Sequence, residues 1–287
     1  MSTNRRTILQ GITGAALLAP YLAAGKALAA PAAPPAAGGS APSHAMDAQT
    51  MRAMSEVFGP GLWGEEQVAM LLYPKFTALD LVGPHYFLAC MWGAKVHLVT
   101  TEKDLSPVMT DLGMAITPTM TMADAPKDLD VVFVPGGTEG TLATMARPDV
   151  IAWLQDRAAR AKHITSVCTG SMVLAKAGLL TGKRATSHWV TREVLADFGA
   201  IPVDERVVRD GNVLTGAGVS AGLDFAVALV EQMRGRAYAE ALVLQGEYAP
   251  NPPIKGGTLA TTSPPVATVM DDMFKPVAGM FRAMAKS

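Results

Sequence analysis

The chain has 287 residues, with 24 Lys and Arg against 25 Asp and Glu, and 49% of its residues are hydrophobic. This length is sufficient for one full α/β domain with a sizeable core and additional tails. The balanced charge provides no basic face for nucleic acid. Two cysteines are too few for a disulfide framework or a cysteine-rich metal site. We therefore expect no nucleic-acid partner.

Residues 1–29 have the features of an export signal. Arg5-Arg6 precede an apolar run from Gly11 to Ala24, and Ala27-Leu28-Ala29 offers a small-residue cleavage site. The segment 4–10 resembles the twin-arginine export motif. The apolar run is too short to span a bilayer as a stable anchor, although an uncleaved anchor is the alternative. We expect cleavage near Ala29 and a periplasmic location.

Three further segments follow the signal. Residues 30–65 are expected to form a flexible tether, rich in Pro, Ala and Gly over 31–43, and then a short helix over 47–58 that packs its methionines on the domain. Residues 66–250 form the main domain, and 251–287 form a linker and an amphipathic C-terminal helix. We expect this helix to pack on the domain or on a second subunit, with contact to a membrane surface as the alternative.

Strands and helices alternate through the main domain. Strands are predicted at 67–73, 96–100, 114–118, 130–134, 163–167 and 184–187, helices at 79–91, 148–160, up to 177, 191–198, 221–233 and 237–247, and a hairpin at 207–214. The proline at 118 places that strand at an edge or in a hairpin. This order indicates an α/β fold with a doubly wound, mostly parallel sheet sandwiched by helices. The active site of such a sheet lies beyond the carboxyl ends of its strands.

Three groups of chemically useful residues follow strand ends. Cys168 stands between an apolar strand and a helix, in a strand–turn–helix pattern typical of a nucleophile elbow. The helix dipole and free N–H groups there are expected to lower the pKa of the thiol. Asp80 follows the first strand and Gly136-Gly137 follow the strand at 130–134, so all three groups can meet. A core cysteine and a helix-capping aspartate are the alternatives.

These motifs resemble the ThiJ/PfpI superfamily. The similar segments include Phe76–Pro84, Val134–Gly137, Val167–Ser171, Gly178–Gly182 and Arg184–Trp189, and the similarity extends from about Val68 to Gln245. The motif around Asp80 is most similar to the isonitrile hydratase branch, and also to amidase-like sensor domains of AraC-type regulators. The resemblance implies a flavodoxin-like fold, a homodimer, and no metal or organic cofactor.

The resemblance implies cysteine-dependent hydration of an isonitrile, or a similar small electrophile, to an N-substituted formamide. Cys168 would attack the terminal carbon, and Asp80, with its pKa raised by burial and by the nearby thiolate, would carry the proton. Gly136 and Gly137 would offer backbone N–H groups to developing negative charge. Thr169 would bind substrate or water through its hydroxyl or N–H group, or else cap the following helix.

Two other classes of function remain open. His188, twenty residues after Cys168, would act as a base in an amidase or peptidase, which requires a hydrogen bond between the two residues. Oxidation of Cys168 to a sulfinic acid would instead define a periplasmic redox sensor or ligand-binding protein. A closed apolar pocket above Cys168 favours the hydratase, whereas an open, shallow thiol favours the sensor. We interpret Cys90 as a core residue of the first helix of the domain, and the role of Asp224 stays open.

Overall fold

The computed structural model describes residues 37–38 and 46–286. The predicted export signal lies outside these residues, as does the predicted tether apart from Ala37–Gly38, which forms the two-residue strand β1. Helix α1 (Ala48–Phe58) follows, with Asp47 capping its first turn. The prediction that its methionines pack on the domain is wrong for Met51, which is exposed, and α1 contributes no buried residue.

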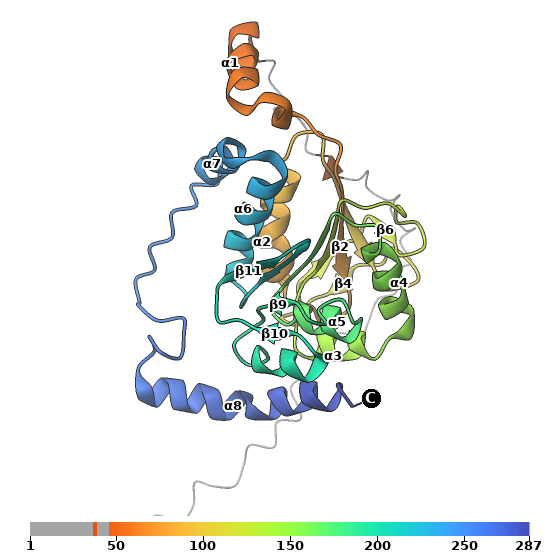
Figure 1. The fold of residues 1–287 in the computed structure, drawn as a ribbon, viewed down its shortest axis with the longest axis vertical. Helices are drawn as coiled ribbons and strands as arrows, with labels where there is room; N and C mark the ends of the chain where they lie inside the picture. The colour runs from red at the N-terminus through yellow and green to blue at the C-terminus, as the bar shows by residue number, and fades with distance from the viewer. Residues whose placement is uncertain (1–36, 39–45, 287) are drawn as a thin grey trace, which may run out of the picture. The chain divides into compact units, whose positions relative to one another are not determined.

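A mostly parallel sheet forms the centre of the domain, as predicted (Figure 1). Within the described residues its strand order is β1–β3–β2–β7–β8–β12–β11, and β6 (Met120–Thr121) also pairs with β3. The β2–β3, β2–β7, β7–β8 and β8–β12 pairs are parallel. The bounds are β2 Gln67–Leu72, β3 Lys95–Thr100, β7 Val131–Val134, β8 His163–Val167, β11 Val207–Asp210 and β12 Val213–Gly216.

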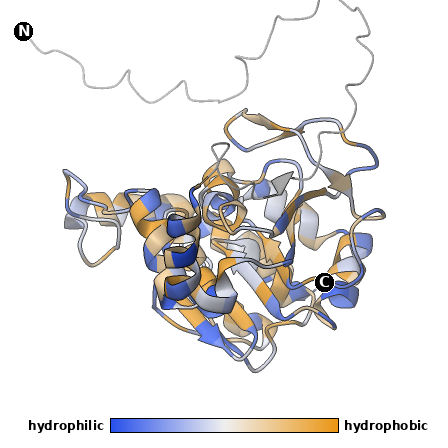
Figure 2. Ribbon diagram, turned by 90° about the horizontal axis from the view of Figure 1, so that it is seen from above, coloured by the Kyte–Doolittle hydropathy of each residue, from blue (hydrophilic) through white to orange (hydrophobic). Residues whose placement is uncertain are grey.

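Helices cover both faces of the sheet (Figure 1). Helices α2 (Ala78–Ala89) and α6 (Ala221–Arg234) pack together on one face, and α7 (Arg236–Gln245) contacts α6. On the other face lie α3 (Glu139–Met145), α4 (Pro148–Ala158) and α5 (Gly170–Lys176). Because both faces are covered, all residues of β2 from Val68 to Leu72 are buried, as the continuous apolar run predicts. Figure 2 shows that single helices carry both hydrophobic and hydrophilic residues, as helices that cover a sheet and face solvent do.

The remaining elements differ from the predictions in detail. The segment Glu193–Phe198 is a 3₁₀ helix, η2, and α3 was not predicted. Strand β5 (Ala115–Ile116) pairs with β4 (Val108–Met109) in a hairpin outside the main sheet, and β9 (Arg184–Ala185) pairs with β10 (Ile201–Pro202). Helix α8 (Pro264–Ala283) ends the chain. None of the described helices has both the length and the apolar character needed to cross a membrane.

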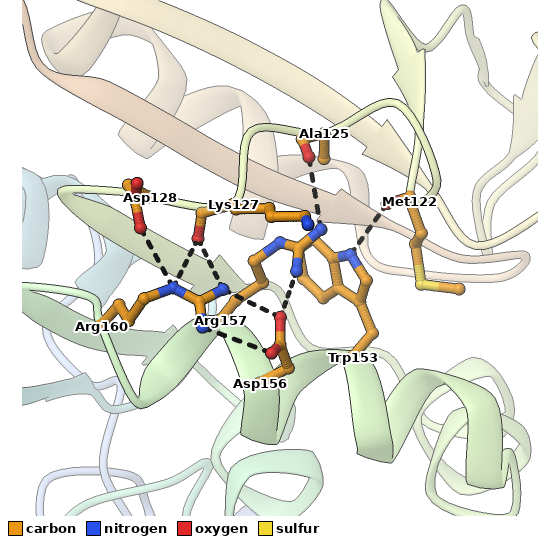
Figure 3. A network of polar contacts seen from close by, with 8 residues as sticks. All are labelled: Met122, Ala125, Lys127, Asp128, Trp153, Asp156, Arg157 and Arg160. Carbon is orange, nitrogen blue, oxygen red and sulfur yellow. Dashed lines mark hydrogen bonds and ion pairs between the residues drawn. The ribbon is translucent and has the colours of Figure 1, made fainter.

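A polar network fixes α4 against the segment that leads into β7 (Figure 3). Asp156 lies between Arg157 and Arg160 and accepts hydrogen bonds from both. These arginines also donate to the backbone carbonyls of Ala125 and Lys127. The network therefore fastens α4 to the loop between β6 and β7.

Candidate active site

The switch point of the sheet lies between β2 and β7, since the chain passes from β2 outward to β3 and then returns to β7 on the other side. Ligands of doubly wound sheets bind at such a point, outside the carboxyl ends of the strands. Asp80 follows β2, Gly136 follows β7, and Cys168 follows β8. The fold thus brings together the three groups that the sequence placed at strand ends.

Cys168 occupies the sharp turn between β8 and α5. Its φ angle is 58°, in a region that few non-glycine residues adopt. The Cys168 N–H donates to the carbonyls of Gly216 (3.1 Å) and Ala217 (2.7 Å), and its carbonyl accepts from the hydroxyls of Ser171 and Ser187 (3.1 Å each). Surrounding bonds of this kind are what maintain a strained turn, which costs about 1–3 kcal/mol. The geometry is that of a nucleophile elbow.

Asp80 is completely buried in the first turn of α2. Its Oδ2 accepts a hydrogen bond from the N–H of Gly136, 2.9 Å away. The N-cap position of α2 belongs to Thr77, so the interpretation of Asp80 as only a helix cap is wrong. Asp80 Oδ1 is buried without a hydrogen-bond partner among the described residues, which leaves it available to a proton or a ligand.

Asp80 and Cys168 form a coupled pair. Burial raises the pKa of Asp80 to about 7, against the lowering effect of the hydrogen bond from the Gly136 N–H and of the neighbouring Cys168 thiol. Burial also raises the pKa of Cys168, and the charge of Asp80 raises it further, although the N–H of Thr169 opposes this. The predicted lowering of the thiol pKa is therefore wrong, because burial and a neighbouring carboxylate outweigh the start of a short helix. The thiol therefore keeps its proton at neutral pH, and the pair holds a second proton, on Asp80, below a pH of about 7.

The glycine loop after β7 supports this pair directly. A Cβ atom at Gly136 would lie 2.6 Å from Asp80 Oδ2, 2.7 Å from the N atom of Thr169 and 2.8 Å from the Cβ of Cys168. Only glycine fits between the carboxyl and the thiol. The N–H groups of Gly136 and Gly137 point to Asp80 and to the Thr169 hydroxyl (2.9 Å each), rather than to substrate as expected. They position site residues instead of presenting an open oxyanion site.

A buried chain of hydroxyl groups supports the loop from below. Thr169 Oγ1 donates to the carbonyl of Gly137 (2.8 Å) and lies 2.9 Å from Thr141 Oγ1. Thr141 Oγ1 in turn lies 3.0 Å from Tyr73 Oη, which donates to the carbonyl of Pro135 (2.6 Å). With these partners and the Gly137 N–H, the Thr169 hydroxyl does not cap α5. Neither Tyr73 nor Thr141 was predicted as a site residue, because each appears in the sequence as an ordinary core position.

His188 lines the pocket but forms no hydrogen-bonded pair with the thiol among the described residues. Burial lowers the pKa of its ring to about 4, so the ring is neutral at neutral pH. Its Nδ1 accepts a bond from the N–H of Val190 (3.4 Å). Within residues 46–286 no hydrogen bond joins His188 to Cys168. Asp224 takes no part in the pocket; it pairs with Arg206 and accepts a hydrogen bond from Tyr248 (2.8 Å).

A cavity of about 130 Å³ opens above Cys168. The thiol-bearing residue is only 5% exposed. The wall combines residues from several elements, two of them in α8: Thr77, Gly137, Thr138, Cys168, Thr169, His188, Val190, Val219, Phe274 and Val277. In the part of the chain that the structure describes, no group of three or more His, Cys, Asp or Glu side chains is arranged to hold a metal ion.

The fold and the elbow define a flavodoxin-like α/β protein with a buried cysteine at the switch point. The sequence profile of the DJ-1/PfpI family matches residues 66–232. The chain is 46% identical over 212 residues to an isonitrile hydratase from Pseudomonas putida. The aligned residues cover 74% of this chain and 90% of that hydratase. The structure of a ThiJ/PfpI family protein from Pseudomonas syringae is also 46% identical, covers 85% of this chain and 98% of its own, and superposes with a TM-score of 0.80. This chain belongs to the DJ-1/PfpI family.

The family contains proteins of other functions. The HTH-type transcriptional regulator CdhR from Pseudomonas aeruginosa is 31% identical over 134 residues, which cover 46% of this chain and 39% of the regulator. Membership alone therefore does not define an activity, and the chemistry must be argued from the site.

Proposed function

We propose that this protein hydrates an isonitrile, or a similarly small electrophile, to an N-substituted formamide. The observation that carries the proposal is the buried carboxyl of Asp80 beside the Cys168 thiol, together with the small pocket that Cys168 lines. The 46% identity to an isonitrile hydratase over most of both chains supports the same reaction.

The pair suits each step of the reaction. The Cys168 sulfur attacks the terminal carbon of R–NC, while Asp80 takes the thiol proton and delivers it to the same carbon. The product is a covalent thioimidate, R–N=CH–S–Cys168. Water then adds to the same carbon while the nitrogen gains a proton. The C–S bond breaks, Cys168 recovers a proton, and R–NH–CHO leaves. A carboxyl with a pKa of about 7 can both accept and donate a proton at neutral pH.

The geometry of the pocket disfavours the two alternatives. A peptidase or amidase requires a base beside the thiol, and His188 makes no hydrogen bond to Cys168 among the described residues. A redox sensor requires an exposed thiol of low pKa, whereas Cys168 is 5% exposed and its pKa is raised. A cavity of about 130 Å³ fits a compact organic molecule.

Formamide formation from cyclohexyl isocyanide by the freshly reduced protein tests the proposal. We expect turnover by the wild type and by Cys90→Ser, a matched control at a half-buried cysteine outside the pocket. Turnover should disappear in Cys168→Ala. A reduced wild type that produces no formamide from this or from smaller isonitriles would refute the proposed function.

A further inference from the structure

The C-terminal helix supplies part of the pocket wall. Four aliphatic or aromatic hydrocarbon side chains line the cavity above Cys168, and two of them, Phe274 and Val277, belong to α8. The rest of the wall is contributed by residues within the 66–250 domain. A helix joined through a long linker thus completes a site built by the sheet.

Helix α8 is fixed to the domain mainly through its C-terminal half. Phe281 is completely buried, Arg282 lies 3.5 Å from Asp197, and Lys176 Nζ donates to the carbonyl of Met284 (2.9 Å). Its N-terminal half is largely exposed, with Val269 at 65%. The linker from 250 to 263 has no helix or strand and is exposed at nearly every residue. Phe274 lies at the transition between the fixed and the exposed halves.

Aromatic contacts hold the Phe274 ring over the pocket. Its centroid lies 5.7 Å from that of Trp189 with the rings 82° apart, an edge-to-face arrangement, and 6.3 Å from the His188 ring. Phe274 therefore meets His188 and Trp189, which follow β9. An apolar wall at this position excludes water from the thiol and limits what reaches it.

We propose that Phe274 and Val277 are specificity-determining residues, which restrict the Cys168 pocket to small, compact apolar isonitriles. With α8 in place the cavity measures about 130 Å³. A dry apolar cavity of about 150 Å³ is known to hold benzene, so one small ring or a short branched chain fills this space. The choice of isonitriles rests on the proposed hydratase function, whereas the control of access to the thiol does not.

Labelling of Cys168 by two thiol reagents of different size tests access without turnover. Iodoacetamide serves as the small probe and N-benzylmaleimide as the bulky probe, with labelling of each cysteine followed by peptide mass spectrometry. Cys90 is a separate site in the same molecule and is absent from the pocket wall, so it serves as an internal control for folding. Phe274→Ala is compared with Met273→Ala, a matched change at a 55% exposed neighbour on the same helix.

We expect Phe274→Ala to accelerate bulky labelling of Cys168 by about tenfold or more, because removing several carbons from an apolar wall is worth at least that factor in discrimination. Iodoacetamide labelling should change much less, and Met273→Ala should change neither rate. Val277→Phe should slow the bulky probe. Among substrates, the kcat/KM of a naphthyl isonitrile relative to that of tert-butyl isonitrile should rise by a similar factor in Phe274→Ala.

Equal labelling in Phe274→Ala and Met273→Ala with both probes would overturn the inference. So would an unchanged ratio of kcat/KM in Phe274→Ala while formamide is still produced. Size-dependent labelling with no formamide from any form would support control of access by α8 and refute the hydratase function, so the two failures are distinguishable.

Discussion

Replacement of Asp80 by asparagine is expected to stabilise the protein, and the gain should grow with pH. The pKa of the buried carboxyl is raised from 3.8 to about 7, with burial as the largest cause. Each unit of difference in pKa between the folded and unfolded states corresponds to about 1.4 kcal/mol. The full difference corresponds to a free energy of about 4 kcal/mol, and because Asp80 is completely buried, solvent does not screen it.

The sign follows from which state binds the proton. Between pH 3.8 and about 7 the folded protein retains a proton that the unfolded chain releases. The free energy of unfolding of the wild type therefore falls as pH rises through this interval. Asparagine carries no such proton, so the difference between variant and wild type should increase from a small value near pH 4 to about 4 kcal/mol near pH 8.

Urea unfolding at several pH values between 4 and 8 measures this difference. The matched control is Asp272→Asn, whose side chain is 62% exposed on α8 and which should show no comparable gain. A stabilisation by Asp80→Asn that is the same at pH 4.5 and pH 8, or that is absent at pH 8, would refute the assignment of a buried carboxyl that holds its proton up to about pH 7.

Three further predictions test the pair and its supports. The kcat/KM for formamide formation should fall about tenfold for each pH unit below about 7, because a second proton then occupies the pair of Asp80 and Cys168. Gly136→Ala should lower kcat by about a hundredfold or more, since its Cβ would lie 2.6 Å from Asp80 Oδ2 and misplace the carboxyl. Tyr73→Phe should lower the free energy of unfolding in urea by about 1–3 kcal/mol, because the buried carbonyl of Pro135 loses its donor.

Each of these has a control and a contradicting result. A rate that stays constant from pH 5 to 8 would contradict a pKa of about 7 for Asp80 in the working enzyme. Gly279→Ala, where a Cβ meets nothing within 4 Å, is the control for Gly136→Ala, and equal activity of the two variants would contradict the close approach. Tyr86→Phe, at a 39% exposed tyrosine, is the control for Tyr73→Phe, and equal stability would contradict the bond to Pro135.

The sequence was sufficient to predict the parallel sheet and the proximity of Asp80 to Cys168. Continuous apolar runs such as Val68–Leu72 predict strands covered on both faces, and strand ends of a doubly wound sheet converge. The elbow was predictable because a strand, a cysteine, small residues and a helix follow one another locally. Helix α3 was missed because Glu139–Met145 is too short to show a helical period.

The protonation of the site could not be predicted from local sequence. The start of α5 beside Cys168 is visible in the sequence, and it suggests a lowered thiol pKa. The opposing effects, burial and the charge of Asp80, come from a residue 88 positions away and from the whole packed core. Likewise, the directions of the Gly136 and Gly137 N–H groups depend on partners in other elements.

The position of α8 on the domain could not be predicted from the sequence either. The apolar spacing from Val266 to Met284 predicts an amphipathic helix, and the structure contains one. An exposed linker fixes no register between that helix and the domain, so Phe274 could not be assigned to the Cys168 pocket. Only the packing of Phe281 and the contacts of Phe274 define that position.

Attack of Cys168 on the isonitrile carbon is the central claim, and capture of the adduct tests it most directly. Reduced protein is mixed with excess alkyl isonitrile, quenched with acid within one turnover, and examined by intact-mass and peptide mass spectrometry. We expect a mass increase of one whole isonitrile molecule on Cys168, because the thiol adds across the carbon with no group lost, and no increase in Cys168→Ala. Formamide produced by Cys168→Ala at the wild-type rate, with no adduct at any time in the wild type, would contradict the mechanism.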